Sequence, residues 1–284
     1  MTEAREEAPD VEQQYRAIVL AGPPGAGKST VLKDVLGEHR GKYLVIDADE
    51  FKRSLLREAQ ADGSYSQWLM PAAIREREAQ GERFFPLELA SLVHEESSYL
   101  AKKLRADAID AGDNIVIDTV LSNETDALAL GERLRDAGYD VRVIDVEVPY
   151  ELSEERIRSR WEHSYATALE SGDSLGGRWV PSEYAREVFH GPGGLSKPEA
   201  AARSLAEQCP AVGRYRVFRT TLEEARAAEV EGRPARATVE VDKTRSARAA
   251  NLVDSPLAGT QNRAAVARPA SVQRTPMTNG PERH

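Results

Sequence analysis

Short runs of apolar residues alternate along the chain with stretches in which apolar residues return every three or four positions. The short runs are typical of buried strands, and the wider spacing is typical of helices with one apolar face. We expect strands over residues 17–21, 42–47, 114–118, 141–148 and 215–218. We expect helices from residue 28 onward and over 50–59, 87–111, 124–137 and 151–170. This alternation predicts an α/β fold, a parallel sheet of about five strands with helices on both faces.

The first predicted strand runs into AGPPGAGKST, which has the spacing G-x-x-x-x-G-K-S of a phosphate-binding loop, or P-loop, and leads into a helix. Positive φ angles at its glycines let successive N–H groups point at phosphate oxygens, and the helix adds the positive end of its dipole. Lys28 can reach the β- and γ-phosphates, and Ser29 can bind Mg²⁺. We predict ATP and Mg²⁺ as cofactors. The expected nucleotide contacts are Gly22, Pro23, Pro24, Gly25, Ala26, Gly27, Lys28, Ser29 and Thr30.

The length and composition of the chain indicate its domain size and its cellular compartment. The 284 residues suffice for one large domain or two small ones. Cys209 is the single cysteine, which excludes an internal disulfide and fits a reducing compartment. No apolar run approaches the roughly 18–20 residues of a membrane span, and the acidic start of the chain lacks the pattern of a signal peptide. The sequence therefore predicts a soluble, cytoplasmic protein with no membrane partner.

Charge is distributed unevenly between an acidic main part of the chain and a basic C-terminal segment. The formal net charge is −9, but residues 243–284 contain seven Lys and Arg against two acidic residues, which leaves −14 on residues 1–242. An acidic body repels phosphate backbones, so no stable binding of nucleic acid is expected. Residues 243–284 have too few apolar side chains to form a core, which predicts a disordered basic tail. We expect a flexible acidic N-terminus over residues 1–14 and a P-loop nucleotide-binding domain over residues 15–242.

Carboxylates stand at the ends of two predicted strands, where ligands bind in open α/β folds. Asp47 and Asp49 lie two residues apart, so we expect them to project to the same side. Asp49 is either the N-cap of the next helix or a base that accepts the proton of an attacking hydroxyl, and we favour the base. For Asp47 we favour the structural role. Asp118 ends the third predicted strand, where it and Ser29 are the candidate ligands of Mg²⁺.

Three more candidates lie on predicted helices or beside them. Glu96 falls in the apolar stripe of the helix over 87–111, where a carboxylate is costly unless it is paired or functional. Arg160 lies at the edge of the apolar stripe of the helix over 151–170. Glycines at 172, 176 and 177 precede Arg178, a layout that suits a lid whose arginine reaches the γ-phosphate when substrates are bound. A surface ion pair is the alternative for each arginine.

From about residue 15 to residue 200 the sequence resembles the zeta toxin family of P-loop kinases. The blocks that carry the resemblance are AGPPGAGKST, YLVIDADEFK, the long helix leading into NIVID, and VEVPYELSEERIRSRWE followed by GGRWVP. The resemblance implies a kinase that phosphorylates a sugar hydroxyl of UDP-N-acetylglucosamine with ATP and Mg²⁺. It also implies an antitoxin as a candidate protein partner, because a small helical antitoxin holds many members inactive.

Position by position, the resemblance assigns further roles. Asp49 matches the catalytic base of the family, and Arg160 and Arg178 match its two phosphate-binding arginines. Asp118 stands where the family has an acidic residue after the third strand. The catalytic set that the resemblance implies is Asp49, Lys28, Arg160 and Arg178.

The sequence departs from the family pattern where the sugar nucleotide is expected to bind. Family members often follow the acidic residue with Gly-x-Thr and an arginine, whereas here Asp118 is followed by Thr119 and Val120. An ungapped match also places Lys102 where the family has a substrate-binding glutamate, and Glu96 can substitute from a different turn. The expected acceptor contacts are Asp49, Glu96, Asp118 and Thr119.

Two other classes of function stay open. A kinase of an antibiotic or of a nucleic-acid 5′-hydroxyl would share the ATP half of the site and differ in the acceptor pocket. A nucleotide-dependent switch without enzymatic activity is the third class. The sequence has no Asn-Lys-x-Asp segment that would read guanine, and a switch does not need two aspartates at an acceptor site.

Overall fold

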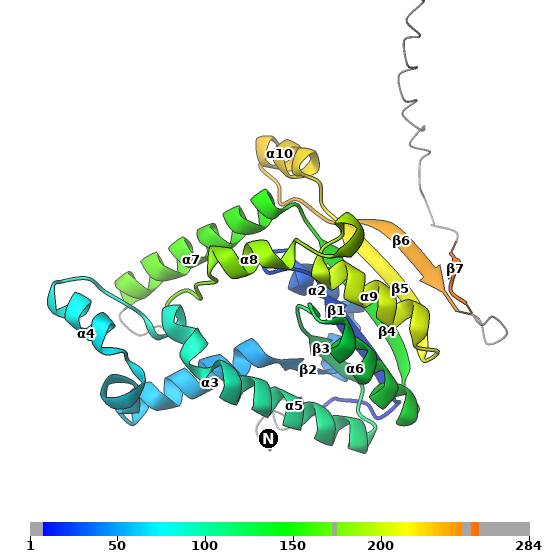
Figure 1. Ribbon diagram of the computed structural model, residues 1–284, viewed down its shortest axis with the longest axis horizontal. Coiled ribbons are helices and arrows are strands. Elements are labelled where there is room, and N and C mark those ends of the chain that lie inside the picture. The colour runs from blue at the N-terminus through cyan, green and yellow to red at the C-terminus, as the bar shows by residue number, and fades with distance from the viewer. Residues whose placement is uncertain (1–7, 172–174, 246–250, 256–284) are drawn as a thin grey trace, which may run out of the picture.

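A seven-stranded sheet forms the centre of the computed structural model, which describes residues 8–171, 175–245 and 251–255. The described strands lie in the order β2-β3-β1-β4-β5-β6-β7 (Figure 1). Five strands are parallel, which confirms the predicted fold class. They are Arg16–Ala21 (β1), Leu44–Asp47 (β2), Ile115–Asp118 (β3), Asp140–Glu147 (β4) and Val212–Arg219 (β5). Antiparallel strands Thr238–Thr244 (β6) and Val253–Asp254 (β7) extend the sheet beyond β5, which the sequence analysis did not predict.

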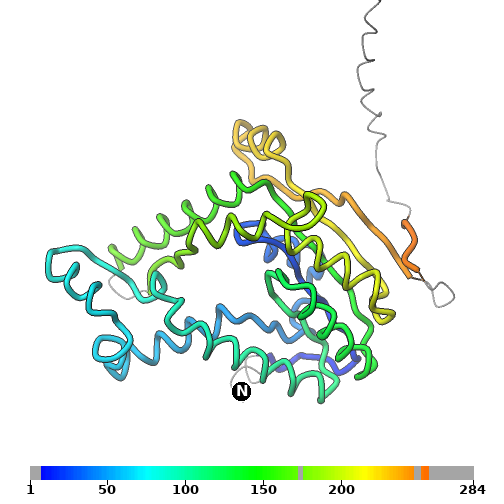
Figure 2. Tube along the Cα trace, viewed as in Figure 1, coloured from blue at the N-terminus to red at the C-terminus, as the bar shows by residue number. Residues whose placement is uncertain are grey.

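Helices connect the strands and cover both faces of the sheet (Figure 1). The segment between β2 and β3 extends away from the sheet. Helices α7 (Tyr150–Ser171) and α8 (Ser182–Val188) extend to the same side (Figures 1 and 2). Within the described residues, the α-helices are Lys28–Leu36 (α2), Ala48–Ala61 (α3), Ala72–Ala79 (α4), His94–Ala111 (α5), Glu124–Asp136 (α6), Tyr150–Ser171 (α7), Ser182–Val188 (α8), Lys197–Gln208 (α9) and Leu222–Val230 (α10). Short helical segments are Gly37–Lys42 (η1), Tyr65–Leu69 (η2), Pro86–Val93 (η3) and Pro192–Gly194 (η4).

Alternating side chains of the strands form two hydrophobic cores, one on each face of the sheet. Val19 and Val143 face the core that α5, α6 and α9 cover, together with Leu134 and Leu205. Ile18 and Ile144 face the opposite core, which α2, α7 and α10 complete. Near-continuous burial explains why these strands read as unbroken apolar runs in the sequence. None of the described helices combines the length and the hydropathy that a bilayer crossing needs.

The predicted helix over residues 87–111 is divided in two. Pro86–Val93 forms η3, in which Leu89 has non-helical backbone angles, and α5 begins only at His94. The break shifts the phase of the second helix, so its buried positions include Ser97 and Leu104 and exclude Glu96, which is exposed. The prediction that Glu96 lies on a core-facing stripe is therefore wrong. Its role in binding the acceptor stays a prediction without that support.

The domain begins earlier than the predicted boundary at residue 15. Glu12 donates its backbone N–H to Lys42 (3.2 Å) and accepts from the N–H of Asn114 (2.7 Å), and its carboxylate pairs with the Lys42 ammonium. Ala8 and Val11 pack against the core beneath β1. The flexible N-terminus was predicted from its charge, which gave no weight to these two apolar residues. Residues 1–7 lie outside the described part of the chain.

The domain also continues past the predicted boundary at residue 242. β6 ends at Thr244, and the pairing of Lys243 with Asp254 adds β7. The Arg245 side chain donates to the carbonyls of Val212 (3.1 Å) and Ala206 (2.8 Å). The prediction of a disordered tail from residue 243 is therefore wrong for residues 243–245 and 251–255. The rest of that segment lies outside the described residues.

Two truncations test this boundary. Ending the chain after Asp242 removes the Arg245 contacts and the packing of Leu252, so we expect a loss of about 1–3 kcal/mol in the free energy of unfolding. Ending it after Ser255 removes a segment of few apolar residues, so we expect the Tm to stay within about 2 °C of the parent. Thermal unfolding of both proteins measures this. Equal Tm values for the two truncations would contradict the corrected boundary.

Candidate active site

The phosphate-binding loop joins the end of β1 to the start of α2. Gly22, Gly25 and Gly27 have φ angles of +131°, +73° and +96°, which confirms the positive φ predicted for all three. A Cβ on Gly22 would stand 2.2 Å from the carbonyl oxygen of Val146 on β4, so glycine is required there by space as well as by φ. Lys28 opens α2, and its ammonium donates to the Gly22 carbonyl at 3.1 Å.

Lys28 is surrounded by the carboxylates that follow the neighbouring strands. Burial lowers the pKa of Lys28, and the negative charges of Asp118, Asp47 and Asp49 oppose that shift. The parallel register aligns Asp47 with Asp118 and Asp118 with Leu20, so these side chains meet at one edge of the sheet. Burial raises the pKa of Asp118, and it raises the pKa of Asp47 to about 6. The sheet thus gathers the predicted acidic residues around the P-loop lysine.

The two aspartates after β2 have different structural positions. Asp47 is the N-cap of α3, and its side chain accepts from the backbone N–H of Asp49 at 2.8 Å. Asp49 lies in the first turn of α3, so the expectation that both project from one face of a strand is wrong. The helix begins two residues earlier than predicted because Asp47 caps it. This arrangement leaves the Asp49 carboxylate available for contacts across the site.

Asp49 is held by two cations from different parts of the chain. Lys52, buried one turn along α3, donates to one carboxylate oxygen at 3.1 Å. The guanidinium of Arg178, which follows α7 by several residues, makes a hydrogen-bonded ion pair with the other oxygen. The structure therefore brings the predicted base and one predicted phosphate-binding arginine into direct contact. No local sequence pattern could show this contact, because 129 residues separate the two.

Arg160 and Arg178 lie close enough to repel each other. Burial lowers the pKa of Arg160, repulsion from Arg178 and Arg53 lowers it further, and Asp49 opposes the shift. Arg53 is a site residue that the sequence analysis missed. It stands four residues after Asp49 on α3, a spacing that places both side chains on one face of a helix. That spacing was the available signal. Its Nε lies 3.7 Å from the Glu50 carboxylate, and 46% of its side chain is exposed.

The glycines before Arg178 serve close packing. A Cβ on Gly176 would stand 2.3 Å from Cβ of Phe85, and one on Gly177 would stand 2.7 Å from the carbonyl oxygen of Trp161. These contacts fix the segment that carries Arg178 against α7 and η3. A lid that closes over substrates stays a prediction, and residues 172–174 lie outside the described part of the chain.

The predicted Mg²⁺ ligands offer suitable oxygen atoms. Ser29 is exposed on the first turn of α2, and Asp118 is half-buried at the end of β3. The described residues form no group of three or more His, Cys, Asp or Glu that could hold a metal. Mg²⁺ that binds together with phosphates needs only one or two protein ligands, so this donor set fits. Thr119 uses its hydroxyl in the adjoining turn, where it accepts from the N–H of Leu121 at 3.2 Å.

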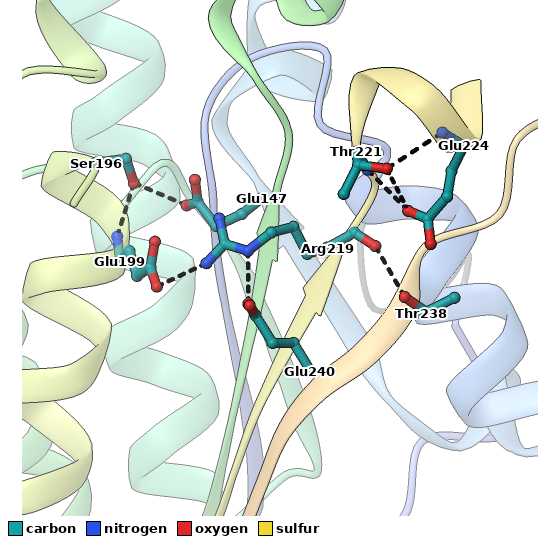
Figure 3. A network of polar contacts seen from close by, with 8 residues as sticks. All are labelled: Glu147, Ser196, Glu199, Arg219, Thr221, Glu224, Thr238 and Glu240. Carbon is teal, nitrogen blue, oxygen red and sulfur yellow. Dashed lines mark hydrogen bonds and ion pairs between the residues drawn. The ribbon is translucent and has the colours of Figure 1, made fainter. Parts of the chain in front are cut away.

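A second acidic cluster, also missed, lies behind the loop on the α9 face of the sheet. Asp145 and Glu147 are buried two residues apart on β4. Ser196 donates to Glu147 at 2.8 Å, and Arg219 bridges Glu199 (2.8 Å) and Glu240 (2.5 Å) (Figure 3). Burial raises the pKa of both β4 acids, with added repulsion from Glu199 on Asp145. The Asp145 and Glu147 carboxyl groups also hydrogen-bond to each other, which requires a proton on at least one of them.

The site geometry agrees with a comparison of the whole sequence. The family model described as zeta toxin matches residues 2–75 and 77–226. The chain belongs to the zeta toxin family. Membership in this family, together with the P-loop geometry, supports a P-loop kinase of the toxin type that uses ATP. It also confirms the resemblance drawn from the sequence blocks.

Other similar proteins share part of the chain or its fold. "Calmodulin calcium-dependent NAD kinase" of Arabidopsis thaliana is 32% identical over 112 residues, which are 38% of this chain and 18% of the relative. The crystal structures of AvrRxo1-ORF1:AvrRxo1-ORF2 with sulphate ions and of AvrRxo1-ORF1:-ORF2 with ATP have TM-scores of 0.58 and 0.57. Both are 18% identical and cover 89% of this chain and 66% of the other. At that identity they show a shared fold alone.

The buried acids on β4 predict a pH dependence of stability. A carboxyl whose pKa is raised by folding loses stability as pH rises from its unfolded pKa, near 4, through its folded pKa. Asp145→Asn removes one titrating group, so the variant should gain stability over the parent at pH 8 by several degrees in Tm and gain little at pH 4. Asp140→Asn, at the exposed start of the same strand, is the control. A Tm difference that does not grow with pH would contradict protonated acids at this position.

Proposed function

We propose that this zeta toxin family member transfers the γ-phosphoryl group of ATP to a hydroxyl of a small molecule that carries phosphate groups. The observation that carries the proposal is the meeting of Asp49 and Arg178 beside a P-loop with the required backbone angles. A base for an acceptor hydroxyl and a cation for a transferring phosphate are the two parts that phosphoryl transfer needs beyond the nucleotide loop. A nucleotide switch without catalysis gives no reason for this arrangement.

Each residue then has a defined role. Asp49 takes the proton of the acceptor hydroxyl while the oxygen of that hydroxyl attacks the γ-phosphorus of ATP. The bond between the γ-phosphorus and the β–γ bridging oxygen breaks, and ADP leaves. Lys28 and the loop N–H groups hold the phosphates. Arg160 and Arg178 stabilise the charge of the transition state. Mg²⁺, when bound near Ser29 and Asp118, would neutralise charge on the phosphate oxygens.

UDP-N-acetylglucosamine is the first candidate acceptor, on the strength of family membership. Arg53 supports an acceptor with phosphate groups, because it adds a partly exposed guanidinium on the face of α3 that carries Asp49. Because Lys28, Arg160 and Arg178 serve the ATP phosphates in this scheme, Arg53 is free to serve the acceptor. A protein partner of the antitoxin type fits the same family membership.

NAD is a second candidate acceptor. The curated relative named as an NAD kinase is 32% identical over 112 residues, although this chain spans only 18% of it. NAD also carries two phosphates and free ribose hydroxyls, so Arg53 is compatible with both molecules. The departures after Asp118 and at Lys102 lie where the sugar nucleotide was expected to bind, and they favour testing both.

Transfer of label from γ-³²P ATP decides between the acceptors. The purified protein is incubated with labelled ATP, Mg²⁺ and, separately, UDP-N-acetylglucosamine, NAD, an aminoglycoside and an oligonucleotide with a 5′-hydroxyl. We expect a labelled product with one of the two diphosphate-bearing molecules and none with Lys28→Ala protein. Label in the aminoglycoside or the oligonucleotide alone would contradict the proposed acceptor class. No transfer to any acceptor, with ATP bound, would favour the switch.

Arg53→Ala tests the acceptor half of the proposal. A hydrogen bond to a charged group contributes about 1.5–3 kcal/mol, so the KM for the diphosphate-bearing acceptor should rise roughly 10- to 100-fold. The KM for ATP should change little, since Arg53 lies on the acceptor side. Arg57→Ala, exposed one turn further along α3, is the matched control. A rise in the ATP KM instead, or no change in either, would remove Arg53 from the acceptor site.

A further inference from the structure

The carbonyl groups of the phosphate-binding loop need partners of their own. When the N–H groups of such a loop turn toward phosphates, its C=O groups face the opposite way, into the protein. A buried carbonyl without a donor costs free energy, and a loop with unsatisfied carbonyls can lower that cost by changing shape. The side chains that donate to these carbonyls therefore influence the direction of the N–H groups.

The first two turns of α7 supply those donors. The hydroxyl of Ser153, which is fully buried, donates to the Pro24 carbonyl at 2.7 Å. The guanidinium of Arg156 donates to the carbonyls of Gly25 and Ala26, each at 3.3 Å. Three successive loop carbonyls thus bind side chains from one helix that is about 130 residues away in the sequence.

Close packing holds α7 and the loop in register. A Cβ on Gly25 would stand 2.8 Å from the backbone oxygen of Ser153 and 3.4 Å from Cγ1 of Ile157. Glycine at that position therefore lets the helix backbone approach the loop as well as allowing the positive φ. Burial lowers the pKa of Arg156, in agreement with a guanidinium taken out of water to reach the loop.

The same helix carries Arg160, one of the two arginines proposed to bind phosphate. Arg160 follows Arg156 by four residues, one turn further along α7. A displacement of α7 would move the donors to the loop carbonyls and the Arg160 side chain together. One helix therefore holds both the donors to the loop carbonyls and Arg160.

We propose that Ser153 and Arg156 are positioning residues that hold the phosphate-binding loop in its ATP-binding shape from the side opposite the phosphates. The proposal rests on the proposed function in one respect, that this loop binds ATP. It predicts that loss of either donor weakens ATP binding through the shape of the loop. The residues proposed to hold the acceptor, Asp49 and Arg53, lie on α3 and not on α7, so acceptor binding should be spared.

Equilibrium binding of ATP tests the proposal without any acceptor. We expect the Kd for ATP to rise roughly 10- to 100-fold in Ser153→Ala and Arg156→Ala, because each leaves loop carbonyls without their donor. Arg156→Lys, which can donate to one carbonyl, should fall between Arg156→Ala and the parent. Ser159→Ala and Arg158→Ala, exposed on the same helix, are matched controls and should bind ATP as the parent does. With the acceptor found above, the acceptor KM of Ser153→Ala should stay within about 3-fold of the parent.

The outcomes separate the two proposals. A parent protein that does not bind ATP contradicts the proposed function. A parent that binds ATP, with Ser153→Ala and the Arg156 variants binding as tightly as the Ser159 and Arg158 controls, overturns the positioning role. Thermal unfolding without nucleotide shows which variants are folded at the temperature of the assay. If Arg156→Ala is not folded at that temperature, the ATP Kd values of Ser153→Ala and Arg156→Lys, compared with those of the two controls, decide whether the positioning role holds.

Discussion

The ion pair between Asp49 and Arg178 joins two segments that the sheet itself does not connect. Asp49 belongs to the helix after β2, and Arg178 belongs to the segment between α7 and α8. Their side chains are 34% and 30% exposed, so the pair contributes at most about 1 kcal/mol to stability. A contact that weak can be exchanged at small cost for contacts to substrates. In the proposed reaction Arg178 passes to the transferring phosphate, and Asp49 is left to accept the proton of the hydroxyl.

Parallel register and helix packing supply the rest of the site. The strands β1, β2 and β3 end at one edge of the sheet, which brings Asp47 and Asp118 to the P-loop lysine. Helix α7 packs on the other side of the loop and carries Arg160 beyond its contacts with the loop carbonyls. In the proposed function, Arg160 on α7 serves ATP, whereas Asp49 and Arg53 on α3 serve the acceptor. This separation is why substitutions on the two helices are expected to affect the binding of different substrates.

Features that depend on a few neighbouring residues could be predicted from the sequence. The positive φ angles of the loop glycines followed from the motif, and the strand-helix alternation gave the fold class. A helix directly after Asp47 and Asp49 was predicted, although its start was placed two residues late and Asp47, not Asp49, is its N-cap. The stripe that included Glu96 failed because a 3₁₀ segment broke the predicted helix and changed its phase.

Features that depend on contacts between distant segments could not be predicted. The sequence around Arg156 does not distinguish it from a surface arginine on a helix. Only the fold brings its guanidinium to the carbonyls of the phosphate-binding loop. Asp145 looked like one more residue of an apolar strand, and its burial depends on α9 and β5. For Arg53 the sequence showed only that it lies four residues, about one helical turn, after Asp49. These side chains require the tertiary structure because their partners lie on other elements.

The claim that Asp49 is the base of a phosphoryl transfer can be measured most directly in a single turnover. Parent and Asp49→Asn protein are loaded with γ-³²P ATP and mixed with the acceptor that the parent labels. Asparagine keeps the shape of the side chain but cannot take the proton, so transfer should slow by roughly 10²–10⁴-fold while ATP affinity stays near that of the parent. Transfer at close to the parental rate by folded Asp49→Asn protein would contradict the account.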